Sequence, residues 1–169
     1  HSCLVGSEMC IRDSSYIDVV KHVGSDVPFF INKQPATISG IGENVVNLND
    51  TQPIKIIIAV PKKGLSTKEI FEKYDEMKPK NTKKYSWNDI SLFNDLWNTS
   101  VEIYPELNTI KQNLEDRYNK NFFMSGSGSA LFSLFEENEE IEEIDSEEFN
   151  LKYFSITKKI DCSFSQNDD

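Results

Sequence analysis

The chain has 169 residues, with 28 acidic against 18 basic side chains and a formal net charge of −10. This length suits one domain with a single hydrophobic core. The hydrophobic fraction of 38% argues against global disorder, and no run approaches the ~20 apolar residues that cross a bilayer. The acidic balance argues against a nucleic-acid partner, because a nucleic-acid surface needs a basic face. We expect no membrane partner either. The acidic balance does not exclude small phosphorylated ligands, which backbone amides can hold.

The first fourteen residues stand apart from the rest of the chain. Residues 4–14 read LVGSEMCIRDS, which resembles the conceptual translation of a transposon-type sequencing adapter. We therefore expect residues 1–14 to be an adapter artefact and the native start to be missing. The segment also lacks the layout of a signal peptide. Without it Cys162 is the one cysteine left, which excludes a disulfide framework and favours a reducing compartment.

Hydrophobic periodicity and turn residues predict a mixed α+β chain. The β-branched run IKIIIAV from Ile54 is typical of a strand buried on both faces. An apolar spacing of three and four residues predicts a helix over 86–99, and Pro105 suits the first position of the next helix. Helices are predicted at 16–23, 68–74, 86–99, 105–118 and 136–148, and strands at 29–31, 36–41, 45–48, 54–60, 122–124, 130–135 and 151–156. From Ile54 onward this is the split βαβ order of a ferredoxin-like sandwich.

The turn GSDVPFF, residues 24–30, is a first candidate site. A carboxylate such as Asp26, held between glycine and proline, can accept or orient a hydroxyl proton. The alternative interpretation is an aspartate that caps a turn through its side chain, and the local sequence alone favours it.

The segment MSGSGSA, residues 124–130, is a second candidate. Small residues let the backbone approach a polyanion, and successive N–H groups can form an anion-binding nest. It is not a Walker loop, because no Gly-Lys-Ser/Thr follows. A Gly-Ser hairpin between two strands explains the same residues equally well.

Five segments in order carry a family resemblance: GSDVPFF, GIGE at 40–43, LSTKEIF at 65–71, FNDL at 93–96 and MSGSGSALFSLF at 124–135. Together they resemble the C-terminal two-thirds of a GHMP-superfamily kinase. The resemblance implies an ATP-dependent small-molecule kinase that uses Mg²⁺. It divides the chain into a remnant of the N-terminal catalytic lobe at 15–52, a GHMP C-terminal domain at 53–161 and a frayed tail at 162–169.

The resemblance also implies roles for individual residues. Asp26 matches the catalytic aspartate of the family, and Asn94 and Asp95 match an Asn-Asp pair to which we assign a helix-positioning role. Thr67 and Phe71 match a segment that lines a cytidine pocket, where an aromatic face stacks on the base. The turn matching the family's phosphate-proximal motif comprises Gly126, Ser127, Gly128 and Ser129.

Among GHMP kinases, the similarity is greatest to those that phosphorylate the erythritol hydroxyl of a CDP-linked sugar alcohol in non-mevalonate isoprenoid biosynthesis. Such an enzyme works in the bacterial cytoplasm or in plastids. Two alternatives stay open. One is a GHMP kinase acting on homoserine or a mevalonate derivative. The other is a non-catalytic ferredoxin-like module that uses residues 126–129 as an anion nest.

The chain lacks two family features, an early Pro…Lys-Ile-Asn segment and a long glycine-rich phosphate loop. Phosphoryl transfer depends on positioning and on neutralising phosphate charge, so their loss should remove most of the rate. We therefore expect the 169-residue chain neither to bind ATP tightly nor to turn over. Purified chain that phosphorylates substrate in an ATP-dependent assay would refute this.

Overall fold

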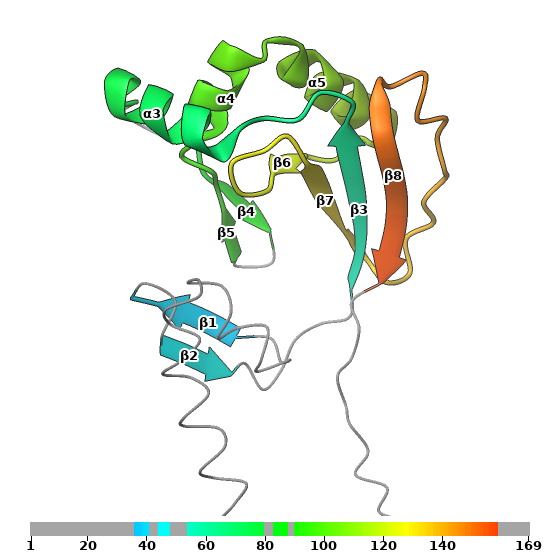
Figure 1. Ribbon diagram of the computed structural model, residues 1–169. Helices are drawn as coiled ribbons and strands as arrows, with labels where there is room; N and C mark the ends of the chain where they lie inside the picture. The colour runs from blue at the N-terminus through cyan, green and yellow to red at the C-terminus, as the bar shows by residue number, and fades with distance from the viewer. Residues whose placement is uncertain (1–35, 41–43, 48–53, 80–82, 88–89, 159–169) are drawn as a thin grey trace, which may run out of the picture. The chain divides into compact units, whose positions relative to one another are not determined.

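The structure, a computed structural model, describes residues 36–40, 44–47, 54–79, 83–87 and 90–158 (Figure 1). The chain divides into two units, one comprising residues 1–52 and 160–169 and the other residues 53–159, and each is described by itself. The predicted helix at 16–23, the predicted strand at 29–31 and the turn that carries Asp26 lie outside the described residues.

In the first unit the described residues form an antiparallel hairpin. Strand β1 (Ala36–Ser39) pairs with β2 (Asn44–Asn47), with Ala36 opposite Asn47 and Ser39 opposite Asn44. This confirms the two strands predicted from the sequence for the part that the structure describes.

The second unit is built on a four-stranded antiparallel sheet. Its strands are β3 (Ile54–Pro61), β6 (Phe123–Met124), β7 (Leu131–Glu136) and β8 (Leu151–Lys158), in the order β6-β7-β3-β8. Because β7 lies between β3 and β6, it splits the βαβ unit that these two strands form with the intervening helices. The predicted ferredoxin-like α+β fold is therefore confirmed.

Helix α3 (Thr67–Met77) begins one residue earlier and ends three residues later than predicted. The Ser66 side chain caps it by accepting a hydrogen bond from the backbone N–H of Glu69 at 3.5 Å. Lys78 ends the helix in the left-handed conformation, with φ of 41°. Ile70 is fully buried while Phe71 is 51% exposed, so consecutive side chains point to the core and to solvent.

The predicted helix over 86–99 is wrong. The structure instead has strands β4 (Tyr85–Trp87) and β5 (Ile90–Leu92), paired antiparallel, followed by helix α4 (Trp97–Ile103). Apolar residues at 85, 87, 90 and 92 alternate on each side of Asn-Asp, a turn-forming dipeptide, which is the pattern of a hairpin. The apolar residues that suggested one helix therefore lie in two different structures, a pair of strands and the helix that follows it.

Helix α5 (Glu106–Tyr118) packs on the sheet and supplies much of the core. Leu107, Ile110 and Leu114 are buried at the helical spacing of three and four residues. Tyr118 ends the helix stacked on Phe154 of β8, with ring centroids 6.3 Å apart. Burial raises the pKa of its phenol, whose hydroxyl donates to the Glu142 carbonyl at 2.7 Å.

The predicted helix at 136–148 is also wrong, because this segment is irregular between β7 and β8. It contains nine acidic residues and no basic one, and like charges three and four residues apart destabilise a helix. The segment is held by its side chains. Its carboxylates pair with cations of other elements, in Lys62–Glu147, Arg117–Glu142 and Lys120–Glu139. Ile141, Ile144 and Phe149 pack against the core.

The Lys120 ammonium and the Glu136 backbone N–H both donate to the Glu139 carboxylate, and they lower its pKa. A carboxylate with a depressed pKa adds stability above its unfolded-state pKa and loses it as the pH falls through the folded one. The contribution of Glu139 to holding this segment is therefore present at neutral pH and is lost in acid.

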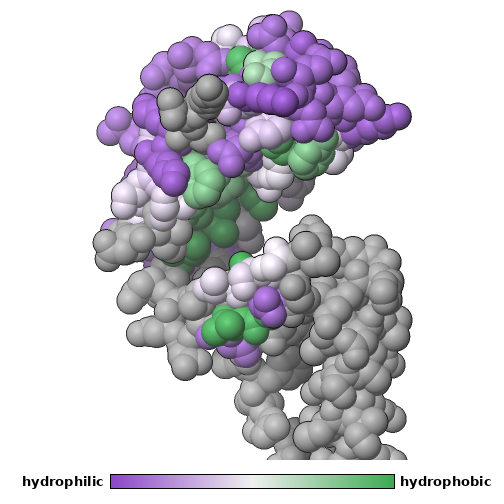
Figure 2. Space-filling view, turned by 90° about the vertical axis from the view of Figure 1, so that its left-hand side faces the viewer, coloured by the Kyte–Doolittle hydropathy of each residue, from purple (hydrophilic) through white to green (hydrophobic). Residues whose placement is uncertain are grey.

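The surface of the second unit is mostly hydrophilic over its helices, with hydrophobic residues gathered beneath them (Figure 2). Phe71 and Phe93 are exceptions, exposed by 51% and 49%. Among the residues that the structure describes, no helix has the length and apolar character to span a membrane.

Replacing Leu114 by alanine tests the packing of α5 on the sheet. Leu114 is fully buried, so we expect Leu114→Ala to lower the free energy of unfolding by about 2–5 kcal/mol, through lost apolar contact and the cavity left behind. Chemical denaturation followed by circular dichroism measures this. Gln112→Ala, at an exposed position of the same helix, is the control and should change stability by less than about 0.5 kcal/mol.

Candidate functional site

The glycine-rich turn joins β6 to β7 and is closed by its own backbone. The Ser125 N–H donates to the Ala130 carbonyl at 2.9 Å, and the Gly128 N–H donates to the Ser125 carbonyl at 3.0 Å. Gly126 and Gly128 have φ of 57° and 88°, which favour glycine. A Cβ on Gly128 would also lie 2.8 Å from Met124 Sδ. Both glycines are therefore required by the shape of the turn.

Asn94 holds this turn from beneath. Its Nδ2 donates to the carbonyls of Met124 and Gly126, at 2.8 and 2.9 Å. Its Oδ1 accepts from the Leu96 N–H at 2.9 Å, just before α4 begins. One side chain thus fixes both the glycine-rich turn and the chain entering α4.

The orientation of the Gly126 carbonyl determines where the next N–H points. The carbonyl and N–H of one trans peptide point in opposite directions. Because the Gly126 carbonyl is turned toward Asn94, the Ser127 N–H points away from it. The bonds that close the turn use the N–H groups of Ser125 and Gly128, so the Ser127 N–H takes no part in them.

The opposite wall of the site is the segment between β3 and α3. Thr67 Oγ1 and Ser127 Oγ are 2.8 Å apart and hydrogen-bonded, across 60 positions of sequence. The Ser129 hydroxyl donates to the Lys63 carbonyl at 2.7 Å. The first residue of α3 and the glycine-rich turn are therefore neighbours, held by two hydroxyl contacts.

Phe71 lies one helical turn after Thr67 on the same face of α3. Half of its surface is exposed, so an aromatic face is open to a ligand near the residue that contacts the turn. This arrangement offers hydroxyl and backbone donors for an anion and a ring for stacking.

The turn residues have no titratable side chain, so the turn itself supplies no general base. Within the described ranges, no three His, Cys, Asp or Glu side chains are grouped as metal ligands would be. A proton acceptor for chemistry at the turn must therefore come from outside the turn.

The structure thus brings together two of the predicted groups of residues. Thr67 contacts Ser127, and Phe71 follows on the same helix face. Asp26 lies outside the described residues, so its convergence with the turn stays a prediction.

Sequence reasoning missed the larger part played by Asn94. Its helix-positioning role agrees with the Leu96 contact, but its hold on the turn was not foreseen. The sequence offered only a weak signal, an asparagine followed 30 residues later by the glycine-rich motif.

Residues 83–147 match the family described as GHMP kinases C terminal. This part of the chain is therefore assigned to the GHMP kinase C-terminal domain family. The matched range includes α4, α5, β6, β7 and the turn.

The similar curated proteins include two kinases of one named activity. The chain is 38% identical over 114 residues to the 4-diphosphocytidyl-2-C-methyl-D-erythritol kinase of Protochlamydia amoebophila, covering 66% of this chain and 40% of that protein. It is 29% identical over 161 residues to the kinase of the same name from Clostridium acetobutylicum, covering 88% of this chain and 54% of that protein. The chain thus spans about half the length of these relatives.

A solved structure supports the fold. The crystal structure of a 4-(cytidine 5'-diphospho)-2C-methyl-D-erythritol kinase matches 70% of this chain and 47% of its own, with a TM-score of 0.54 and 21% sequence identity.

Substitutions at Asn94 separate its two functions. We expect Asn94→Ala to speed amide hydrogen exchange at Ser125 and Gly128 by about tenfold or more, because two carbonyls lose their donor. Asn94→Asp keeps an acceptor for the Leu96 N–H but has no donor, so it should loosen the turn while α4 stays protected.

The control is Asn98→Ala, on the exposed side of α4, which should leave exchange in the turn unchanged. Unchanged exchange at Ser125 and Gly128 in Asn94→Ala would show that Asn94 does not hold the turn.

Proposed function

We propose that the protein carrying this domain is an ATP-dependent kinase that phosphorylates the erythritol hydroxyl of 4-diphosphocytidyl-2-C-methyl-D-erythritol. The hydrogen bond between Thr67 and Ser127 carries the proposal, because it joins the expected substrate-binding helix to the expected phosphate-proximal turn. The names of the relatives support the choice of substrate.

The proposed task of the turn is to face the transferring phosphoryl group. The Ser127 N–H points away from Asn94, and the Ser127 hydroxyl lies against Thr67, so both are suited to donate to phosphate oxygens. Gly126 leaves room for the approach, because a Cβ there would meet nothing within 4 Å, and Ser129 anchors the turn to Lys63.

The donors present fit a phosphate, although the turn adds no charge of its own. ATP supplies the phosphoryl group, and Mg²⁺ bound with it would neutralise its charge. We propose that Asp26 accepts or orients the proton of the attacking hydroxyl, since the turn has no base. In this proposal residues 15–52 belong to the catalytic lobe and residues 53–161 form the GHMP C-terminal domain.

Phe71 is proposed to stack on the cytosine of the substrate. Its ring is half exposed and lies beside Thr67 on α3. A cytidine-specific site needs such a surface, whereas a kinase acting on homoserine or a mevalonate derivative does not.

A kinase assay on the complete gene product tests the proposal. We expect Phe71→Ala to raise KM for the cytidine substrate by about tenfold or more, since stacking contributes roughly 1–3 kcal/mol. KM for ATP should stay within about twofold, because the ring is assigned to the other substrate. The matched control is Tyr153→Ala on β8, a ring of similar exposure (54%) that should leave both constants unchanged.

If the complete gene product phosphorylates homoserine or a mevalonate derivative and not the cytidine compound, the proposed substrate is wrong. A complete gene product that binds phosphate compounds but turns over none of these substrates would favour the non-catalytic module.

A further inference from the structure

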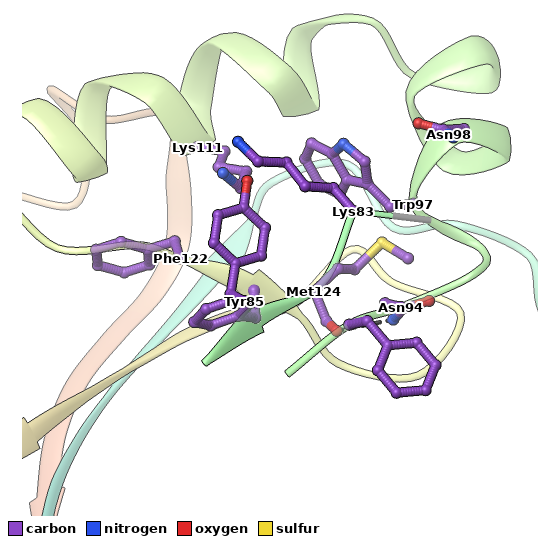
Figure 3. A pocket seen from close by; sticks show the side chains of 10 residues that line it. Lys83, Tyr85, Asn94, Trp97, Asn98, Lys111, Phe122 and Met124 are labelled. Atoms are coloured by element: carbon purple, nitrogen blue, oxygen red, sulfur yellow. Dashed lines mark hydrogen bonds between the residues drawn. The ribbon is translucent and has the colours of Figure 1, made fainter. Parts of the chain in front are cut away.

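A pocket lies next to the glycine-rich turn, among the β4–β5 hairpin, α4, α5 and β6 (Figure 3). Its volume is about 240 Å³. Pockets for drug-sized ligands range from about 300 to 1,000 Å³, and a cavity of about 150 Å³ can hold benzene. The size therefore suits a molecule with one ring and one substituent.

The walls of this pocket are largely aromatic and apolar. Tyr85, Trp97 and Phe122 contribute rings, and Met124 contributes a thioether (Figure 3). Such flat, polarizable surfaces favour a planar ring over an aliphatic chain.

The polar groups of the pocket include the Tyr85 hydroxyl and the ammonium groups of Lys83 and Lys111, all of which line it (Figure 3). The Lys83 ammonium lies 4.6 Å from the Tyr85 ring centroid. Hydrogen bonding to Tyr85, together with the nearby charges of Tyr85 and Glu115, raises the pKa of Lys83. Like any lysine near its ordinary pKa, Lys83 is charged at neutral pH.

The charged side chains at the polar end of the pocket carry a net positive charge. Lys111 pairs with Glu115 and lies 5.6 Å from the Trp97 ring centroid. Glu115 also accepts from the Phe122 N–H at 2.9 Å, so its carboxylate is already engaged twice. Two lysines against one glutamate leave one positive charge beside an aromatic cavity, in a chain whose net charge is −10.

We propose that this pocket binds a small aromatic anion, a single ring bearing one carboxylate-like group. The ring occupies the space among Trp97, Phe122 and Met124, and the anionic group faces Lys83, Lys111 and the Tyr85 hydroxyl. The inference rests on the pocket alone and does not depend on the proposed kinase activity.

The pocket shares two residues with the glycine-rich turn. Asn94 and Met124 line it, and Asn94 also holds the carbonyls of Met124 and Gly126. The Met124 thioether lies directly beneath Gly128. A bound ring therefore touches the supports of the turn and alters its environment.

Titration of the ¹⁵N-labelled 169-residue chain with benzoate tests the proposal, with benzyl alcohol and benzylamine as neutral and cationic probes of the same ring. We expect benzoate to bind with Kd of about a few millimolar and at least fivefold tighter than either probe. Amide shifts should centre on residues 83–85, 97 and 122–124, with smaller shifts at Gly126 and Gly128.

Two adjacent lysines provide the matched variants. Lys83 lines the pocket, whereas Lys84 is absent from the lining and reaches only the rim, where its ammonium lies 5.0 Å from the ring centroid of Phe93, a lining residue. Both are exposed, so neither change should affect folding. We expect Lys83→Gln to weaken benzoate at least fivefold without affecting benzyl alcohol, and Lys84→Gln to leave both unchanged.

Three results would overturn the proposal: equal binding of benzoate and benzyl alcohol, equal weakening by the two lysine changes, or shifts centred on Phe71 instead of the pocket. If benzoate binds more tightly than the other two probes but causes no shifts at Gly126 and Gly128, the proposed effect of a bound ring on the glycine-rich turn is refuted.

Discussion

The double donation from Asn94 to the carbonyls of Met124 and Gly126 is the contact on which the arrangement of this domain depends. A glycine-rich turn can adopt many conformations when it is free, and restricting it to the observed one, with left-handed Gly126 and Gly128, costs conformational entropy. Asn94 selects one of them by fixing two carbonyls, and its own position is fixed by the chain entering α4. The conformation of the turn is therefore fixed through Asn94 by the start of α4.

This constraint explains why residues far apart in sequence form one site. With the turn fixed, Ser127 meets Thr67, and Ser129 meets the Lys63 carbonyl. Neither hydroxyl contact alone would hold a flexible loop, since a single hydrogen bond contributes only about 1 kcal/mol. Together they connect β6 and β7 to the segment between β3 and α3.

Sequence patterns predicted the sheet well, because β-branched runs such as IKIIIAV have few alternatives. They failed at 86–99, where aromatic residues fit both a helical stripe and a hairpin, and pairing between strands decided the outcome. They also failed at 136–148, where apolar residues at 141, 144 and 149 pack without a helix. The family resemblance pointed to Thr67 and Phe71 as candidate site residues. The hydrogen bonds from Asn94 to the turn are tertiary contacts, which no local sequence pattern encodes.

The irregular acidic segment has a consequence for how the domain responds to its solvent. Besides the packing of Ile141, Ile144 and Phe149 and the hydrogen bonds to its carbonyls, such as that from Tyr118 to Glu142, the segment is attached by ion pairs near the surface, which dissolved salt screens. The sheet beneath is joined by backbone bonds and apolar packing that salt weakens little. Rising ionic strength therefore loosens this edge first and uncovers the ring of Tyr118, while the opposite side of the domain, with its glycine-rich turn, keeps its form.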